Sequence, residues 1–210
     1  MTLFTSLVPT AQYIDWQTIQ QTFAWFRRME GCLQSPIHHG EGDVLIHTRM
    51  VCEALIADPV WQALNITDRQ SLFWAALLHD VAKPECTRVD SDGKMTSRGH
   101  GGRGQIMARS ILWRLGVPFV QRELICHLIT HHQLPFFILE RQRPEQIAHQ
   151  ISLQTRCDFL AMLADADARG RICADQQRLL DNIELFRQLC RDENCFSMPK
   201  AFPSPHSRFL

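Results

Sequence analysis

The sequence lacks a net charge, because 22 lysines and arginines balance 22 aspartates and glutamates in 210 residues. A chain with this balance does not hold nucleic acid by counterion release over a broad basic surface, so any such contact must be local. Hydrophobic residues make up 45% and charged residues 21%, which is typical of a globular protein and excludes wholesale disorder. The length fits one domain, or one domain with an appendage.

The sequence also lacks the marks of export and of membrane insertion. Its eight cysteines include no CxxC pair and are scattered among apolar residues, which suits a reducing compartment and excludes a small disulfide framework. The first residues, MTLFTSLVPTAQYIDW, have no basic segment followed by an apolar stretch and are not typical of a signal peptide. No run approaches the roughly 18 apolar residues of a membrane span. We therefore predict a cytoplasmic protein that has no membrane partner.

Helical periodicity covers most of the chain. After Asp15, apolar residues recur at spacings of three and four, which predicts a helix there. Asp43 is expected to cap a helix that runs to about Ala57. The segment Thr67-Asp-Arg-Gln70 has the capping-box pattern, and we expect it to start a buried helix that Pro84 stops. Further helices are predicted over 103–115, 118–132, 144–169 with a break near 157, and 174–191.

One segment, residues 85–98, is not helical in pattern. Asp92-Gly93 is a hairpin turn signal between short polar arms, so we expect a small β-hairpin. The predicted fold is therefore an all-α bundle with one hairpin insertion, and the predicted domain covers residues 1–195. Residues 196–210 contain three prolines, at Pro199, Pro203 and Pro205, and are expected to be a linker or tail that leads to a second domain.

Histidine is unevenly distributed, since eight of the ten histidines lie between His38 and His132. The sharpest local feature is His79-Asp80, which begins the segment HDVAKP at the end of an apolar run. An isolated pair of this kind is usually a buried imidazole satisfied by a carboxylate. This pair is not isolated, because further histidines and acids stand at the edges of other apolar helices, as a metal site in a bundle core requires. They are His47, His100, His131, His132, Asp165 and Asp167.

In chain order these residues form the pattern H…HD…H…HH…D, which resembles the HD superfamily of metal-dependent phosphohydrolases. The resemblance covers about residues 37–171, and its most specific elements are HDxxKP at 79–84 and ADxxGR at 166–171. The same elements occur in the HD domains attached to bacterial tRNA nucleotidyltransferases. The segments HHGEGDVLIHT and FPSPHSRFL are similar to bacterial RNA end-healing proteins, in which an HD phosphoesterase precedes a P-loop polynucleotide kinase.

The resemblance implies a ligand set for two divalent ions, with Mn, Fe, Co, Ni and Zn all compatible. Asp165 and Asp167 remain alternatives for the last ligand, because two residues apart on a helix point in nearly opposite directions. We favour Asp167 because it stands three residues before Gly170, as ADxxGR requires. The implied first ion is held by His47, His79, Asp80 and Asp167, and the implied second ion by Asp80, His100, His131 and His132.

The implied reaction removes 2′,3′-cyclic, 2′- or 3′-phosphates from RNA or nucleotide ends. A bound ion lowers the pKa of water from about 15.7 to roughly 7, so that hydroxide attacks the phosphorus while a second ion stabilises the leaving oxygen. His79 and Asp80 are the central catalytic residues. Lys83, one turn after His79, is either a phosphate contact or a charge that complements a helix terminus. No P-loop, GxxxxGK[ST], occurs in the chain, so a polynucleotide kinase would be a fused or separate partner.

The sequence also allows alternative functions and contains weaker candidate residues. A small-molecule nucleotidase or cyclic-nucleotide phosphodiesterase uses the same chemistry, and a non-catalytic metal-containing helical domain is the alternative of another class. Gly99–Gly104 matches GxGxxG, but the arm before it is polar, so we predict no dinucleotide cofactor. Weaker candidates are His38, His39 and Arg103 for phosphate, His127 as a spare ligand, and Phe136 and Phe137 as either base-pocket walls or packing.

Overall fold

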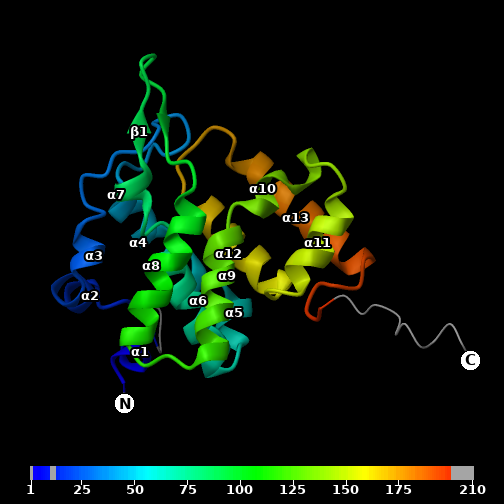
Figure 1. Ribbon diagram of the computed structural model, residues 1–210, viewed down its shortest axis with the longest axis horizontal. Coiled ribbons are helices and arrows are strands. Elements are labelled where there is room, and N and C mark those ends of the chain that lie inside the picture. The colour runs from blue at the N-terminus through cyan, green and yellow to red at the C-terminus, as the bar shows by residue number, and fades with distance from the viewer. Residues whose placement is uncertain (1, 10–12, 200–210) are drawn as a thin grey trace, which may run out of the picture.

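Helices account for nearly all the regular structure in residues 2–9 and 13–199, the parts of the chain that the computed structural model describes (Figure 1). Within those residues the one sheet is an antiparallel hairpin of β1 (Arg88–Val89) and β2 (Met95–Thr96), which projects from the bundle. The predicted all-α fold with one small hairpin is confirmed. No helix in the described residues is long and apolar enough to cross a membrane.

Four helices form the centre of the bundle: α4 (Val44–Ala57), α6 (Ile66–Leu78), α9 (Phe119–His131) and α12 (Cys157–Arg169). Helix α6 packs against each of the other three, and α12 also packs against α4 and α9. Every residue from Gln70 to Leu78 is buried, as expected for a helix that is covered on all sides. The C-terminal end of α6 therefore delivers His79 and Asp80 to the interior.

The remaining helices surround this centre. On one side lie α1 (Leu3–Ser6), α2 (Trp16–Thr22), α3 (Ala24–Arg27) and α5 (Pro59–Ala63), and Phe4 of α1 stacks on Trp74 of α6 at 5.3 Å between ring centroids. Helix α8 (His100–Arg114) packs along α9, and α7 (Lys83–Cys86) packs against α8. Helix α13 (Gln176–Asp192) packs along α12 and contacts α10 (Leu134–Phe137), the 3-10 turn η1 (Ile138–Glu140) and α11 (Pro144–Ser152).

Several helix boundaries were predicted correctly, because their capping residues act locally. Asp43 caps α4 by accepting a hydrogen bond from the Ile46 backbone N–H at 2.9 Å, and Asp15 caps α2 in the same way through Thr18. The break near residue 157 is present, since α11 ends at Ser152 and α12 starts at Cys157.

Other boundaries were predicted wrongly. Asn65, and not Thr67, caps α6, because its side chain accepts from the Asp68 N–H at 3.0 Å. Helix α6 ends at Leu78, before Pro84 has any influence, and Pro84 lies in the first turn of α7, a position that proline favours. Helix α8 starts at His100 and not at 103, because Gly99 takes the left-handed conformation (φ 77°) just before it. Residues 200–210 of the predicted linker lie outside the described residues.

Candidate metal centre

Six buried side chains from four core elements and one neighbouring helix meet at one end of the bundle. His47 comes from α4 and Asp167 from the last turn of α12, while His79 and His132 directly follow α6 and α9. His100 is the first residue of α8. With Asp80, which follows His79, these are six of the seven residues that the sequence assigned to metal binding, and each is at most 7% exposed.

Three of the histidines are oriented by one shared arrangement. In His79, His100 and His132, the ring Nδ1 lies 2.7 Å from the backbone carbonyl oxygen three residues earlier. A carbonyl oxygen only accepts, so Nδ1 carries the proton and the neutral ring keeps its lone pair on Nε2. The Nε2 atoms point away from these anchors and toward Asp80. The His47 ring is held similarly, with Nδ1 2.9 Å from Glu41 Oε1.

Asp80 lies between two pairs of these imidazoles. Its Oδ2 is 3.2 Å from His79 Nε2 and 3.8 Å from His47 Nε2. Its Oδ1 is 3.3 Å from His100 Nε2 and 3.8 Å from His132 Nε2. One carboxylate oxygen therefore faces each histidine pair, so Asp80 could contact an ion held at either pair.

The histidine pairs leave an electrostatic problem that a cation solves. The two Nε2 atoms lie 3.3 Å apart in the His47–His79 pair and 3.3 Å apart in the His100–His132 pair. In the His100–His132 pair both rings carry their proton on Nδ1, so two lone pairs meet face to face at that distance. Neither oxygen of buried Asp80 receives a well-directed hydrogen bond, although Lys83 Nζ lies 2.7 Å from Oδ2. Unpaired acceptors of this kind are costly when buried, so these residues fit divalent metal ions.

The ligand atoms divide into two groups, and within each group all lie within 4.8 Å of one another. His47, His79 and Asp167 form the first group, which Asp80 Oδ2 faces. Asp80, His100 and His132 form the second. Asp167 Oδ1 is 3.1 Å from His47 Nε2.

Burial and charge set the protonation of the centre. Burial lowers the pKa of His132 to about 3 and also lowers the pKa of His100, although Asp80 partly opposes the shift at both rings. Both are therefore neutral at pH 7. Burial opposes the ionised form of Asp80, but His79 and Lys83 hold its pKa well below the usual value. The second group thus presents two neutral imidazoles, those of His100 and His132, to an ionised carboxylate, as a divalent metal ion requires.

The first group differs from the second in the direction of a pKa shift, that of His47. Burial acts to lower the pKa of His47, but the hydrogen bonds that its ring donates to Asp167 and Glu41 outweigh it and the pKa is raised. Arg171 and His47 hold the pKa of Asp167 well below its ordinary range, although burial acts to raise it. An ion held at the first group would have to displace any proton on His47 Nε2.

The structure separates the two candidate aspartates of α12. Asp167 is buried and reaches His47, whereas Asp165 forms ion pairs with Arg169 and with Arg187 on α13, the latter at 3.1 Å. The two side chains leave opposite sides of the helix, as expected for residues two apart. The preference for Asp167, which was based on the spacing of ADxxGR, agrees with this geometry.

The two neighbouring histidines at the end of α9 also separate. His132 joins the second group, but His131 is half-buried and its Nε2 lies 3.0 Å from Gln154 Oε1, outside both groups. Consecutive residues on a helix point about 100° apart, so one approach direction cannot serve both. Of the two histidines that the resemblance implies as ligands here, the structure brings His132 to Asp80 and places His131 against Gln154. His127 lies in neither group.

Sequence reasoning missed three polar residues that support the centre. Glu41 Oε1 lies 2.8 Å from His39 Nδ1 as well as 2.9 Å from His47 Nδ1, and Glu41 Oε2 accepts from the Ile172 backbone N–H. Arg171 donates to both oxygens of Asp167, at 2.9 Å each. Gln34 accepts from Lys83 Nζ at 2.6 Å. Glu41 and Arg171 stand inside the quoted segments HHGEGD and ADxxGR, so the motifs carried a signal for both.

A close helix contact holds the first group together. A Cβ atom added to Gly170 would lie 2.6–3.0 Å from atoms of Val51, including its backbone, so only glycine allows this approach. Val51 stands one turn after His47 on α4, and Gly170 directly follows α12. The absence of a side chain at residue 170 therefore brings the end of α12, with Asp167, against His47.

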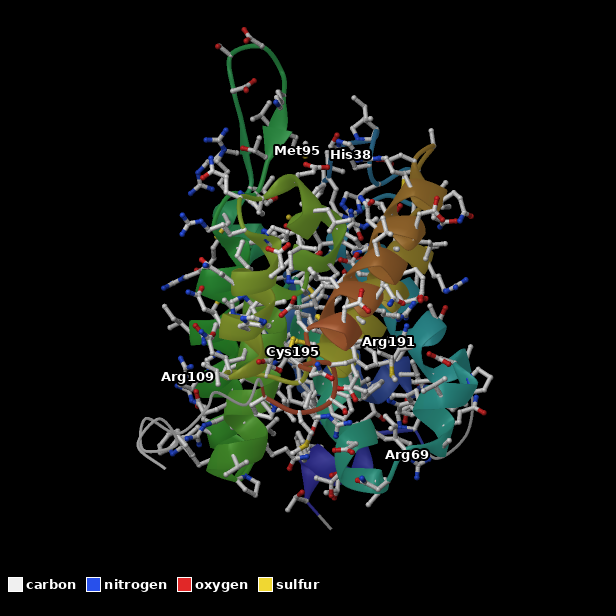
Figure 2. The ribbon with its side chains drawn as sticks, turned by 90° about the vertical axis from the view of Figure 1, so that its right-hand side faces the viewer. His38, Arg69, Met95, Arg109, Arg191 and Cys195 are labelled. Atoms are coloured by element: carbon white, nitrogen blue, oxygen red, sulfur yellow. The ribbon has the colours of Figure 1, made fainter. Side chains whose placement is uncertain are left out.

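A cavity of ≈690 Å³ opens beside the second group. His38 and Met95 lie on its wall, and Figure 2 labels both at one end of the molecule. Five lysines and arginines line the cavity but only one carboxylate, that of Asp175, which gives it a cationic character. The basic residues are Lys83, Arg98, Arg141, Arg171 and Arg178.

The weaker sequence candidates take different positions around this cavity. His39 lines it while bound to Glu41, and Phe137 lines it as well. Phe136 is buried, and the Arg171 guanidinium lies 4.8 Å from its ring centroid, so its role is packing. Arg103 binds Glu85 at the surface, at 2.9 Å, and is not part of the cavity lining.

Known proteins resemble this chain in the region that contains the centre. Two proteins named "Multifunctional CCA protein", from Actinobacillus pleuropneumoniae serotypes 5b and 7, are each 31% identical to it over 157 residues. The aligned region covers 71% of this chain and 36% of each relative, so the chain spans little more than a third of their length. Residues 44–170 match the HD domain, a family associated with metal-dependent phosphohydrolase chemistry, and this match includes all six converging residues. The chain therefore belongs to the HD domain family.

Proposed function

We propose that this chain is a phosphoesterase that removes 2′,3′-cyclic, 2′- or 3′-phosphates from RNA or nucleotide ends. One observation carries the proposal: two pairs of facing imidazole Nε2 atoms flank the oxygens of Asp80 at the wall of a cationic cavity. The imidazole pairs supply places for divalent ions, and the cavity supplies a place for a phosphate beside them.

Each proposed ion has its own set of residues. His47, His79 and Asp167 would hold the first ion, His100 and His132 would hold the second, and Asp80 would contribute one oxygen to each. Bound divalent ions supply a water that is activated near neutral pH and positive charge for an in-line displacement at phosphorus. Mn, Fe, Co, Ni and Zn all suit a mixed imidazole and carboxylate set.

Lys83 is held where it can bind a substrate phosphate. Its Nζ lies 2.7 Å from Asp80 Oδ2 and 2.6 Å from Gln34 Oε1, and the residue is 4% exposed on the cavity wall. Because Lys83 begins α7, its ammonium does not complement the C-terminal carbonyls of a long helix. Its position supports the phosphate role, in which it acts as a point charge.

The shape and chemistry of the cavity suit a nucleotide end. Its ≈690 Å³ lies within the range of roughly 300–1,000 Å³ that is usual for small-molecule sites. Met95, Leu134 and Phe137 add apolar surface on which a base can stack. Arg98 and Arg141 extend the positive charge beyond the reacting phosphate, where the next phosphate of an RNA chain would lie. Such a local contact agrees with a chain of zero net charge.

We further propose a P-loop polynucleotide kinase as the fused or separate partner. Removal of a 3′-terminal phosphate prepares one RNA end, and phosphorylation of a 5′-hydroxyl prepares the other. The likeness of HHGEGDVLIHT to the end-healing proteins supports this pairing.

Hydrolysis assays test the function. The metal-loaded chain is incubated with 2′,3′-cyclic AMP, 2′-AMP, 3′-AMP, 5′-AMP, deoxynucleoside triphosphates and a short RNA that ends in a 2′,3′-cyclic phosphate. We expect release of phosphate from the 2′ and 3′ positions. A preference for 5′-AMP or triphosphates would instead indicate a small-molecule nucleotidase. Failure to hydrolyse any substrate with Mn²⁺, Co²⁺ or Ni²⁺ would indicate a non-catalytic domain.

A further inference from the structure

Three cysteines meet in the interior, in a cluster separate from the histidine centre. Cys157 is the first residue of α12, Cys190 lies in the last turn of α13, and Cys195 follows that helix. Their Sγ atoms all lie within 4.8 Å of one another, and all three residues are at most 1% exposed. Figure 2 shows Cys195 well away from the end of the molecule that His38 and Met95 mark.

The two clusters are carried by opposite ends of one helix. Asp167 stands ten residues after Cys157 on α12, which separates the two Cα atoms by about 15 Å along the helix axis. No thiol belongs to either histidine group. Whatever binds at the cysteines is therefore distinct from the ions of the histidine centre.

The backbone is arranged to bring the cysteines together. Asn194 takes the left-handed conformation (φ 53°), which is unfavourable for most side chains and tolerated by asparagine. This turn lets the Cys195 N–H donate to the Cys190 carbonyl oxygen at 2.8 Å. The Asp158 N–H then donates to the Phe196 carbonyl oxygen at 2.9 Å. The residues that follow Cys157 and Cys195 are thus tied directly to each other.

The three thiols differ chemically from the isolated buried cysteines of the chain. Burial raises the pKa of Cys126 to about 11 and that of Cys52 well above its ordinary value, so both are inert apolar residues. In the cluster, a hydrogen bond from Cys190 lowers the pKa of Cys157, while the contact with Cys157 and burial raise the pKa of Cys190. These two thiols thus act on each other, and with Cys195 they form a set of three adjacent sulfur ligands.

We propose that Cys157, Cys190 and Cys195 form a second metal site, which takes one thiophilic ion of the Zn²⁺ type. Zn–S bonds of about 2.3 Å place tetrahedral sulfur ligands roughly 3.8 Å apart, which is compatible with the observed cluster. Binding displaces the thiol protons to solvent. Such an ion would fasten the C-terminal turn of α13 to the start of α12, so its role is structural.

Cobalt provides a direct test, because Co²⁺ replaces Zn²⁺ and reports sulfur ligands by an ultraviolet sulfur-to-metal charge-transfer band. The reduced, metal-free chain is titrated with Co²⁺ in the absence of air. We expect the band to saturate at one equivalent of thiolate-bound ion, to bleach when Zn²⁺ is added, and to be lost in Cys157→Ser. It should persist in Cys126→Ser, the matched variant at an isolated buried thiol, and in His79→Ala, where only the imidazole centre is altered.

Absence of the band from the wild-type chain would overturn the proposal, as would its survival in Cys157→Ser, Cys190→Ser and Cys195→Ser alike. Circular dichroism shows whether these variants fold. If they do not, X-ray absorption at the zinc edge of the zinc-loaded wild-type chain identifies the ligand atoms, and this measurement needs no substitution. Sulfur scattering at about 2.3 Å supports the site, and a first shell of nitrogen and oxygen alone at about 2.0–2.1 Å contradicts it.

Discussion

The two ends of α12 carry opposite kinds of chemistry. At its C-terminal end, Asp167 joins a mixed set of imidazoles and carboxylates that opens on a cationic cavity. At its N-terminal end, Cys157 joins two other thiols in a region that is closed to solvent. Only the imidazole end opens on a cavity that a substrate can enter, whereas the three thiols are buried away from solvent. One helix thus contributes a residue to the proposed catalytic metal centre and another to the proposed cysteine metal site.

The difference also shows how each end is supported. The imidazoles are oriented by backbone carbonyls and by charged neighbours such as Glu41 and Arg171, which tune protonation. The cysteines are positioned by backbone hydrogen bonds, between residues 190 and 195 and between 158 and 196. Substitutions at the imidazole end should therefore change activity and metal affinity, while the sulfur end should remain unaffected.

The largest effect is expected from Asp167→Ala. It removes a proposed metal ligand and leaves Arg171 buried without its partner, so we expect a loss of about 1,000-fold or more in phosphoesterase activity and a fall of about 3 kcal/mol in the free energy of unfolding. Asp165→Ala is the matched control, two residues earlier, and should keep activity within about twofold. Steady-state assays and chemical denaturation measure both. Equal losses in the two variants would contradict the assignment of Asp167.

The histidine pair at the end of α9 gives the next largest effect. His132→Ala removes one imidazole of the second group, and we expect its metal affinity to fall by about 100-fold, with a comparable loss of activity. His131→Ala should alter metal affinity little, because that ring binds Gln154. Metal titration by calorimetry distinguishes the variants. A stronger effect at His131 would restore the ligand set implied by the resemblance.

Glu41→Gln tests whether the carboxylate that contacts His47 Nδ1 strengthens metal binding at the first group. The amide keeps the shape of Glu41 but loses the charge that orients and polarises His47, so we expect roughly 10- to 100-fold weaker metal binding at the first group. Secondary structure and the cobalt–sulfur band should be unchanged. Metal dependence of the hydrolysis rate measures the effect, and recovery of the rate at high metal concentration would confirm that Glu41 acts through His47.

The stability of the metal-free chain should fall as the pH is lowered from 6.5 to 4. Burial lowers the pKa of His39 to about 4 and that of His132 to about 3, so in this range the unfolded chain binds protons that the folded chain does not. We expect a loss of about 5 kcal/mol, measured by denaturation at each pH. His47 has a raised pKa, and its contribution is lost only as the pH rises above 6.5, so it does not oppose this trend.

Gly170→Ala should have the smallest effect of the series. The new methyl group meets the backbone of Val51, and we expect a loss of about 1–2 kcal/mol in stability as α4 and α12 move apart. His47 and Asp167 then separate, so metal affinity should fall slightly as well. Gly102→Ala, where a Cβ atom has open space, is the matched control. Thermal melting of both variants measures the effect, and an equal loss of stability in Gly102→Ala would contradict it.

Local patterns predicted much of the fold. The helix that Asp43 caps, the hairpin turn at Asp92-Gly93 and the break before Cys157 all depend on residues close together in the chain, so the sequence contains the whole signal. The start of α6 was misplaced because Asn65 and Thr67 are both good capping residues. Either residue could cap the helix in the sequence, and in the structure the Asn65 side chain does so.

Much of the candidate site was also predictable, because its members stand at the edges of apolar helices. The spacing of ADxxGR favoured Asp167, and the structure agrees. The choice of His132 over His131 was not predictable, since both follow the same apolar face and only the rotation of α9 against α6 separates them. Glu41 stands outside any helix, in the segment before α4, so no helical pattern indicates its contact with His47.

By itself, the sequence determined that this chain is helical, that it has one hairpin, and that its histidines and aspartates lie where a bundle core can use them. Only the tertiary structure decided which of these side chains share one ion-sized space, and that three apparently scattered cysteines meet. The physical reason is range: capping and periodicity act over a few residues, whereas Cys157 meets Cys190 and Cys195, more than thirty residues later in the chain, only because α13 packs along α12.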